Sequence, residues 1–247
     1  MRLLGARGFI SFQDIDAALS ASEASLRRDL ARLHKKGLIE RVHGGARLAG
    51  GVAPTLQGVP FQESVAKHAK AKRAIGLAAA RLCEPGEAVI IDGGSTTLQM
   101  CSHIEGLGLQ VLTNALNIVS ALLAQPRTRI SMPAGTLFRE QNIILSPYDD
   151  DGIGGFQASK LFLGAASVGR RGPMQADTLL IQAERRFMKR ADKVILLVDS
   201  SKFEAPTGHL LCALEEVHTV VTDDRITESQ ADMVKRAGVK LLTAPKV

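Results

Sequence analysis

A run of glycine and hydroxyl-bearing residues follows an aliphatic segment, Val89–Ile91, and could bind an anion. The run consists of Asp92, Gly93, Gly94, Ser95, Thr96 and Thr97. Glycines let backbone N–H groups approach an anion closely, hydroxyls add donors, and a helix starting here would add partial positive charge. The run therefore predicts a phosphate-binding turn, with an ordinary hydroxyl-capped strand-to-helix turn as the alternative. It matches neither a nucleotide P-loop nor a dinucleotide GxGxxG motif, and we expect no cofactor and no bound metal.

Two further polar groups stand at the ends of aliphatic segments. Thr113 and Asn114 offer a hydroxyl and an amide, which suit sugar hydroxyls or a phosphate oxygen. An Asn-capped turn is the alternative at that position. Lys202 stands three residues after Asp199 and would be a charge partner for a phosphate or a carboxylate. Asp199 could simply cap the turn between them.

These three groups would face one ligand if the aliphatic segments are parallel strands, because ligands bind at the carboxyl ends of such strands. We expect the phosphate to lie on Gly93–Thr97, with Asn114 and Lys202 closing over it. A carboxylate repels a phosphate, so Asp92 is expected to turn toward sugar hydroxyls or to cap the turn.

A basic segment near the N-terminus has the chemistry of a DNA contact. Residues 1–48 hold nine Lys and Arg against five Asp and Glu, whereas the whole chain has a net charge of +6. Ser25, Arg27, Arg28, Arg32 and Lys35 lie on the polar faces of a predicted helix whose leucines 26, 30 and 33 recur at helical spacing. A basic end on a nearly neutral body favours binding to nucleic acid phosphates. An ordinary helical hairpin with solvated arginines is the alternative.

Composition narrows the class of protein. The 247 residues are 45% hydrophobic and 23% charged, which is typical of a globular protein, and they include one Tyr and no Trp. Recognition of RNA through aromatic stacking is therefore disfavoured. Three cysteines without a CxxC pair argue against a disulfide framework and structural zinc. No apolar run is long enough to cross a membrane and no signal peptide is visible, so we expect a cytoplasmic protein.

The elements that would position the basic segment form a helix-turn-helix with a wing. Ser11–Asp14 resembles a capping box and predicts a short first helix, and Ser22 is a good N-cap for the second. Gly37 is expected to end that helix in the left-handed conformation. Residues 38–43 predict a strand, and Gly44-Gly45 predicts the turn of a wing.

The remainder alternates aliphatic and amphipathic segments. A DNA-binding domain is expected over 1–48, a glycine- and proline-containing linker over 49–62 and a sensor domain over 63–247. An ordered loop packed on the larger domain is the alternative for the second half of the linker. We expect a long helix over 63–82 with Lys67, Lys70, Lys72 and Arg73 exposed. Strands are expected over 88–92, 109–113, 129–132, 161–165, 193–199, 217–222 and 239–243, and helices over 96–105, 115–124, 177–191 and 227–236. This alternation predicts an α/β fold with a mostly parallel sheet and helices on both faces.

Taken together, these residues resemble the DeoR family of bacterial transcription repressors. The N-terminal match runs without gaps from Ser22 to Leu30 and continues through Leu33, Gly37, Leu38, Arg41 and the segment His43–Ala46. The C-terminal match lies at Asp92–Thr97, Thr113-Asn114 and Asp199–Phe203, where the family has Asp-x-Gly-Ser/Thr-Thr, Thr-Asn and Asp-x-x-Lys-Phe. Residues 142–147 and 183–202 look most similar to repressors of ascorbate-utilisation operons.

The resemblance implies a recognition helix over 22–36, a wing over 41–47, and a sensor related in fold to ribose-phosphate isomerase, glucosamine-phosphate deaminase and CoA transferases. Such sensors bind phosphorylated sugars without turning them over. The residues it implies for DNA binding are Ser22, Ser25, Arg27, Arg28, Arg32, Lys35, Arg41, His43, Gly44 and Gly45. The sequence departs from the family where Pro133-Ala-Gly135 replaces a Gly-Gly pair. Met1–Arg7 is all that stands in place of a full first helix, so we expect that the chain as given starts late.

The function expected is therefore a repressor of a sugar-catabolism operon that binds double-stranded DNA as a dimer or tetramer and responds to a phosphorylated sugar or sugar acid. One alternative is an isomerase or deaminase acting on the same ligands. Asp92, Asp177, Glu184, Asp223 and Asp224 could supply carboxylates, but no acid/base pair stands out in the sequence. A second alternative is a DNA-bound structural protein with an inactive sensor.

Overall fold

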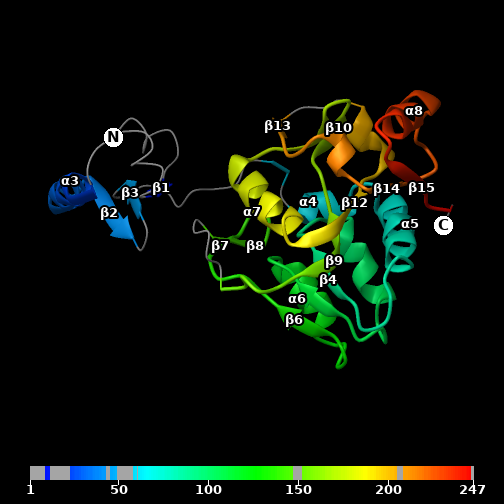
Figure 1. The fold of residues 1–247 in the computed structure, drawn as a ribbon, viewed down its shortest axis with the longest axis horizontal. Helices are drawn as coiled ribbons and strands as arrows, with labels where there is room; N and C mark the ends of the chain where they lie inside the picture. The colour runs from blue at the N-terminus through cyan, green and yellow to red at the C-terminus, as the bar shows by residue number, and fades with distance from the viewer. Residues whose placement is uncertain are drawn as a thin grey trace. The chain divides into compact units, whose positions relative to one another are not determined.

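The computed structural model describes residues 9–11, 23–42, 45–48, 58–59, 61–146, 152–204 and 208–245. The chain divides into a smaller unit up to residue 55 and a larger unit from residue 56 (Figure 1). Each unit has its own buried core, and each is described here by itself.

The smaller unit has the predicted helix followed by a hairpin. Helix α3 (Glu23–Lys35) is followed by β2 (Ile39–Val42) and β3 (Gly45–Leu48), which pair antiparallel, and β1 (Phe9–Ser11) pairs with the other edge of β3. Leu30 and Ile39 are buried between them. Gly37 has φ 66°, the left-handed conformation expected after the helix. The first helix expected upstream lies outside the described residues.

The larger unit is built on a seven-stranded sheet whose strands all run parallel. Its order is β15-β14-β12-β9-β4-β5-β6. The strands are β4 (Ala88–Ile91), β5 (Gln110–Leu112), β6 (Arg129–Ser131), β9 (Ala158–Leu163), β12 (Ala191–Leu197), β14 (Thr219–Thr222) and β15 (Lys240–Thr243). The sequence prediction of a parallel sheet is confirmed, and all seven expected strands are present with ends shifted by up to three residues.

Helices cover both faces of this sheet (Figure 1). Val89 and Ile91 of β4 lie in one hydrophobic cluster, whereas Ile90 lies in another, so alternate side chains enter different cores. The four expected helices are η1 (Thr97–His103), a 3₁₀-helix, and α6 (Leu116–Leu122), α7 (Thr178–Met188) and α8 (Glu228–Arg236). Within the ranges described, none of the helices is both long and apolar enough to cross a membrane.

The long helix expected over 63–82 is wrong, because two helices occupy this region. Helix α4 (Phe61–Ala66) and helix α5 (Ala69–Ala80) are separated at His68, whose φ of 54° is left-handed and interrupts the helix. The break allows the carbonyl of Ser64 to accept a hydrogen bond from the ammonium of Lys72. Helix α4 also begins two residues inside the segment expected as linker.

The expected exposure of Lys72 is also wrong. Its side chain is among the largest fully buried ones in the described part of the chain, with 2% exposed, whereas Lys67, Lys70 and Arg73 are exposed as expected. Helical periodicity placed Lys72 on a polar face, but that face of α5 packs next to the turn after β4. The physical reason is tertiary, since Ser64 and Ser95 supply the acceptors that a buried ammonium needs.

Short elements that the sequence did not predict lie outside the large sheet. They are the hairpin β7 (Thr136–Phe138) and β8 (Ile143–Leu145), the small sheet of β10 (Ser167–Gly169), β11 (Gly172–Gln175) and β13 (His209–Leu210), and the 3₁₀-helices η2 (Ser200–Phe203) and η3 (Leu214–Glu216).

Candidate functional site

The larger unit has a pocket at the point where its strand order reverses. The chain passes from β4 outward through β5 and β6 and then returns to place β9 on the other side of β4. In open parallel sheets this is where ligands bind. The pocket has a volume of about 180 Å³. It is lined by Gly58, Val59, Phe61, Ser64, Asp92–Thr96, Gln141, Ile143, Gly164–Ala166, Gln175, Ala176, Leu180, Glu184, Leu197, Val198 and Lys202.

The turn after β4 leaves backbone donors for an anion. Thr97 is fully buried and closes the turn: its hydroxyl is 2.7 Å from the carbonyl oxygen of Asp92 and accepts from the N–H of Gly94 at 2.9 Å. Among the described residues, the N–H groups of Ser95 and Thr96 donate to no acceptor. Gly93 has no room for a side chain, since a Cβ there would lie 2.6 Å from Ile143. The turn thus has the open amides that a phosphate site requires.

A buried cation lies behind this turn. The ammonium of Lys72 donates to the hydroxyl of Ser95 at 3.0 Å and to the carbonyl of Ser64, and the two serine hydroxyls are 2.9 Å apart. Burial lowers the pKa of Lys72, and the nearby carboxylate of Asp199 opposes this effect. Sequence reasoning missed Lys72 because a single lysine on a predicted helix has no motif to mark it.

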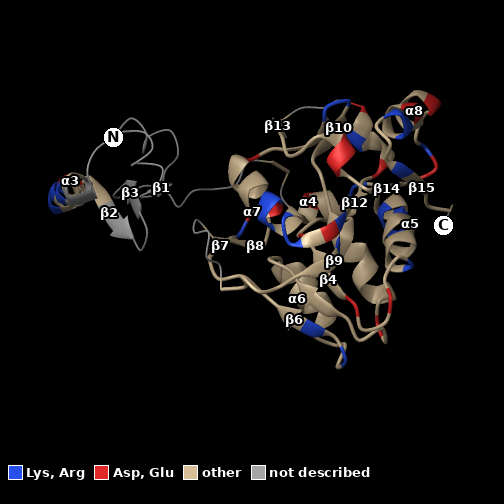
Figure 2. Cartoon of the chain, in the orientation of Figure 1, with Lys and Arg blue, Asp and Glu red and all other residues tan. Residues whose placement is uncertain are grey.

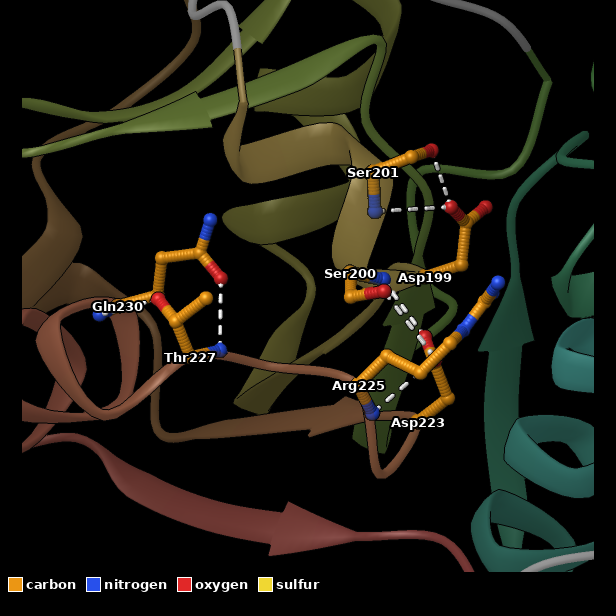
Figure 3. Close-up of polar contacts among 7 residues, drawn as sticks. All are labelled: Asp199, Ser200, Ser201, Asp223, Arg225, Thr227 and Gln230. Atoms are coloured by element: carbon orange, nitrogen blue, oxygen red, sulfur yellow. Dashed lines mark hydrogen bonds and ion pairs between the residues drawn. The ribbon is translucent and has the colours of Figure 1, made fainter.

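The second cation, Lys202, is positioned by η2. Asp199 caps this helix by accepting from the N–H of Ser201 at 3.2 Å and from its hydroxyl (Figure 3). Asp223, after β14, accepts from the N–H of Ser200 at 2.6 Å and from Arg225 at 2.8 Å. Asp199 therefore caps the turn before Lys202, which is the alternative that the sequence left open for it.

Asp223 is consequently a structural carboxylate. Burial raises the pKa of Asp223, but the hydrogen bonds from Arg225 and Ser200 outweigh it and leave that pKa below its ordinary value. Thr227 and Gln230 close a capping box at the start of α8, beside this bracing (Figure 3). Together these contacts fix the backbone that presents Lys202 to the pocket.

Two buried carboxyl groups line the pocket on another side. Asp92 is 7% exposed and accepts from the N–H of Gly164 at 3.4 Å, and burial raises its pKa to about 6. Glu184 of α7 is 3% exposed and accepts from Gln175 at 2.6 Å. Burial and, second, the charge of Asp92 raise the pKa of Glu184 well above its ordinary value. No acid pair stands out in the sequence because these two carboxyl groups, 92 residues apart in the chain, come to line one pocket only in the folded protein.

This pair predicts a pH dependence of stability. The pKa of Asp92 rises from 3.8 to about 6 on folding, so the folded state holds its proton more tightly. The stabilisation is therefore present below pH 4 and is lost as the pH rises toward 6, by up to about 3 kcal/mol. Urea unfolding of the ligand-free protein between pH 4.5 and 7.5 should show a smaller loss in Asp92→Asn than in the wild type. Equal losses would contradict this prediction.

The end of β5 does not reach the pocket. Thr113 is fully buried and its hydroxyl accepts from the N–H of Ala115 at 3.2 Å. Asn114 is 2% exposed, lines a separate cavity of about 10 Å³, and has a side-chain oxygen without a hydrogen-bond partner among the described residues. A cavity of this size holds at most one water molecule. Of the residues expected to bind the effector, Asp92, Gly93, Gly94, Ser95, Thr96 and Lys202 line the pocket, and Thr97, Thr113 and Asn114 do not.

The smaller unit presents a basic helix. Arg28, Arg32 and Lys35 of α3 are exposed, and Figure 2 shows Lys and Arg along this helix. Arg28 donates to Ser25 at 3.5 Å, and Arg32 pairs with Asp29 at 3.2 Å. The backbones of Arg27, Arg41 and Gly45 lie in α3, β2 and β3. Ser22, His43 and Gly44 lie outside the described residues, as do the side chains of Arg27 and Arg41.

Comparisons with known proteins match both units. A family model described as the DeoR C terminal sensor domain matches residues 67–224, and one described as a DeoR-like helix-turn-helix domain matches residues 1–50. The chain is 26% identical to a putative aga operon transcriptional repressor of Escherichia coli O157:H7, over 96% of this chain and 88% of the relative. It is also 26% identical to the HTH-type transcriptional regulator UlaR of Shigella dysenteriae serotype 1, over 98% and 95%.

Solved structures resemble the larger unit in part. Ribose 5-phosphate isomerase A from Methanocaldococcus jannaschii is 12% identical with a TM-score of 0.39, and the similarity covers 53% of each chain. The beta subunit of eIF2B from Chaetomium thermophilum is 16% identical with a TM-score of 0.43, over 62% of this chain and 48% of that one.

Proposed function

Because the chain belongs to the DeoR family of transcriptional regulators, we propose that it represses a sugar-catabolism operon and that a small phosphorylated sugar controls its binding to the operator. The observation that carries the effector part is the pocket beside Ser95 and Thr96, where open backbone amides lie near the ammonium groups of Lys72 and Lys202. A dianionic phosphate needs several charge-assisted donors, and this arrangement supplies them. The volume of about 180 Å³ favours a compact ligand.

The position of residues 58–64 in the pocket supports the proposal that a ligand bound there controls DNA binding. Val59, Phe61 and Ser64 line the pocket, although they belong to the stretch that connects it with the DNA-binding unit along the chain. The side-chain amide of Gln141 donates to the carbonyl of Val59 at 2.9 Å, and the N–H of Phe61 donates to the backbone carbonyl of Glu140 at 3.1 Å. A ligand that contacts Ser95 would compete for the same hydroxyl that Ser64 contacts, and so alter how this segment is held.

The experiment that tests this function combines stability with DNA binding. A thermal-shift screen against sugar phosphates should identify an effector, since a ligand at about 100 times its Kd adds roughly 2.7 kcal/mol of stability. The same compound should change the affinity for operator DNA, measured by fluorescence anisotropy. A compound that binds the pocket without any change in operator affinity would contradict the proposal.

An enzyme acting on the same ligands is the second candidate, and the adjacent carboxyl groups of Asp92 and Glu184 favour it. We propose that the protein is a regulator without catalytic activity. Two relatives that it matches over 88% and 95% of their length are named as transcriptional regulators, and a DNA-binding unit has no role in an isomerase or deaminase. Incubation with the identified effector, followed by NMR, should show unchanged ligand. Conversion of more than one equivalent of the effector per protein chain would favour the enzyme.

We further propose that the protein acts in the cytoplasm, where a bacterial chromosome is transcribed, without membrane attachment.

A symmetric oligomer is expected. Winged-helix proteins bind repeated half-sites as dimers or higher oligomers, and one small domain buries too little DNA surface for tight binding. We expect a dimer or tetramer assembled mainly through the sensor unit. Multi-angle light scattering at micromolar concentration, with and without operator DNA, measures this directly. A monomer under both conditions would count against it.

A further inference from the structure

The side of the pocket formed by α7 and β11 contains an acceptor with no partner. Oε1 of Glu184 accepts from Gln175, but Oε2 is buried and has no hydrogen-bond partner among the described residues. Leaving a buried polar atom unpaired costs free energy, so such an atom in a pocket calls for a ligand group that completes it. Glu184 lines the pocket, and its side chain is 3% exposed.

The neighbours of Glu184 are also acceptors. Nε2 of Gln175 donates both to Glu184 at 2.6 Å and to the carbonyl of Gly164 at 3.2 Å, which uses both of its N–H groups and leaves its oxygen as an acceptor. The orientation of the amide follows, because the carbonyl of Gly164 can only accept. Asp92 adds a second carboxyl group to the same pocket. Among the side chains of Glu184, Gln175 and Asp92, the N–H groups of Gln175 are therefore both used, and oxygen atoms remain to face a ligand.

We propose that Glu184, Gln175 and Asp92 form a subsite for the sugar part of the effector that accepts hydrogen bonds from its hydroxyl or amino groups. The sensor then selects neutral sugar phosphates and amino sugar phosphates, and rejects phosphorylated sugar acids. This inference rests on the proposed function, in which the phosphate occupies the turn after β4.

Electrostatic interactions with Asp92 and Glu184 determine the expected order of binding affinity among these ligands. A ligand carboxylate would bring a third acidic group to Asp92 and Glu184. Buried like charges raise one another's pKa values, so at least one of the three groups would have to take up a proton, which weakens binding. A ligand ammonium would instead form charge-assisted hydrogen bonds with them, which are stronger than hydrogen bonds to neutral hydroxyls. We therefore expect amino sugar phosphates to bind most tightly, then neutral sugar phosphates, then sugar acid phosphates.

The test uses calorimetry on the full chain with four probes that share a phosphate. They are inorganic phosphate, glucose 6-phosphate, glucosamine 6-phosphate and 6-phosphogluconate. We expect the two sugars to bind at least about tenfold more tightly than 6-phosphogluconate, which corresponds to one charge-assisted interaction. In Glu184→Gln this preference should shrink, because the variant has one acidic group fewer to oppose a ligand carboxylate and Asp92 alone remains. Glu215→Gln, an exposed glutamate of η3, is the control and should keep the preference.

Each outcome decides between the two proposals. If none of the four probes binds, the phosphate site of the proposed function is wrong. If inorganic phosphate binds but the sugars gain nothing over it, or 6-phosphogluconate binds as tightly as they do, the acceptor subsite is wrong. The wild-type preference alone tests the subsite, so the conclusion stands even if Glu184→Gln does not fold.

Discussion

Lys202→Met is expected to abolish the response to the effector while leaving operator affinity unchanged. The ammonium of Lys202 lines the pocket and, within the described part of the chain, forms no ion pair, so a bound phosphate would be its partner. Each charge-assisted hydrogen bond contributes roughly 1.5–3 kcal/mol, which predicts at least tenfold weaker effector binding. Methionine keeps most of the side-chain volume, and the contacts that brace η2 come from Asp199 and Asp223.

Thr96→Val tests the same site without a change of charge. The hydroxyl of Thr96 has no hydrogen-bond partner among the described residues although the residue is 6% exposed, so valine should fit with little loss of stability.

Lys70→Met removes an exposed lysine of α5 and is the control for Lys202→Met. Effector titrations followed by operator anisotropy measure all three variants. A normal response in both Lys202→Met and Thr96→Val would mean that the effector binds elsewhere.

Arg28→Ala and Arg27→Ala are expected to weaken operator binding. Arg28 is exposed on α3, and Arg27 precedes it in the same helix. Loss of a contact with a base edge should cost about 1–3 kcal/mol and relax specificity at one position. Loss of a phosphate contact should instead weaken all sequences alike and lower the dependence of affinity on salt by about one unit of slope.

The measurement is operator affinity at several salt concentrations, with specific and random DNA. Arg73→Ala, which removes an exposed arginine of α5 in the larger unit, is the matched control outside the proposed DNA contact. Unchanged affinity in both Arg27→Ala and Arg28→Ala would rule out α3 as the recognition helix.

Local patterns were sufficient to predict the framework of the larger unit. Aliphatic runs such as Val194–Val198 are hydrophobic on both faces, which is how a buried parallel strand is recognised. The seven segments expected as strands all contribute to the sheet. The turn after β4 was found because Gly93, Gly94, Ser95 and Thr96 are adjacent in the chain. Lys202 was found for the same reason, since it follows its strand directly.

The division of roles within that site could not be read from the sequence. The side chain of Thr97 closes the turn and does not face the pocket, and Asn114 belongs to a neighbouring cavity. Strand β5 lies on the far side of β4 from β9, so its end is displaced from the place where the strand order reverses. Strand order is a property of the whole sheet and is not recorded in any one strand.

The sequence alone thus predicted the family, the basic helix of the smaller unit and the glycine-containing turn after β4, because each depends on residues that are neighbours along the chain. Only the tertiary structure showed that Lys72 is buried behind Ser95, that residues 59–64 form a wall of the pocket, and that Asp92 and Glu184 share it. These relations join residues far apart in the chain, and the energy of each depends on burial. Removal from water is what lowers the pKa of Lys72 and raises those of Asp92 and Glu184, and burial is decided only when the chain has folded.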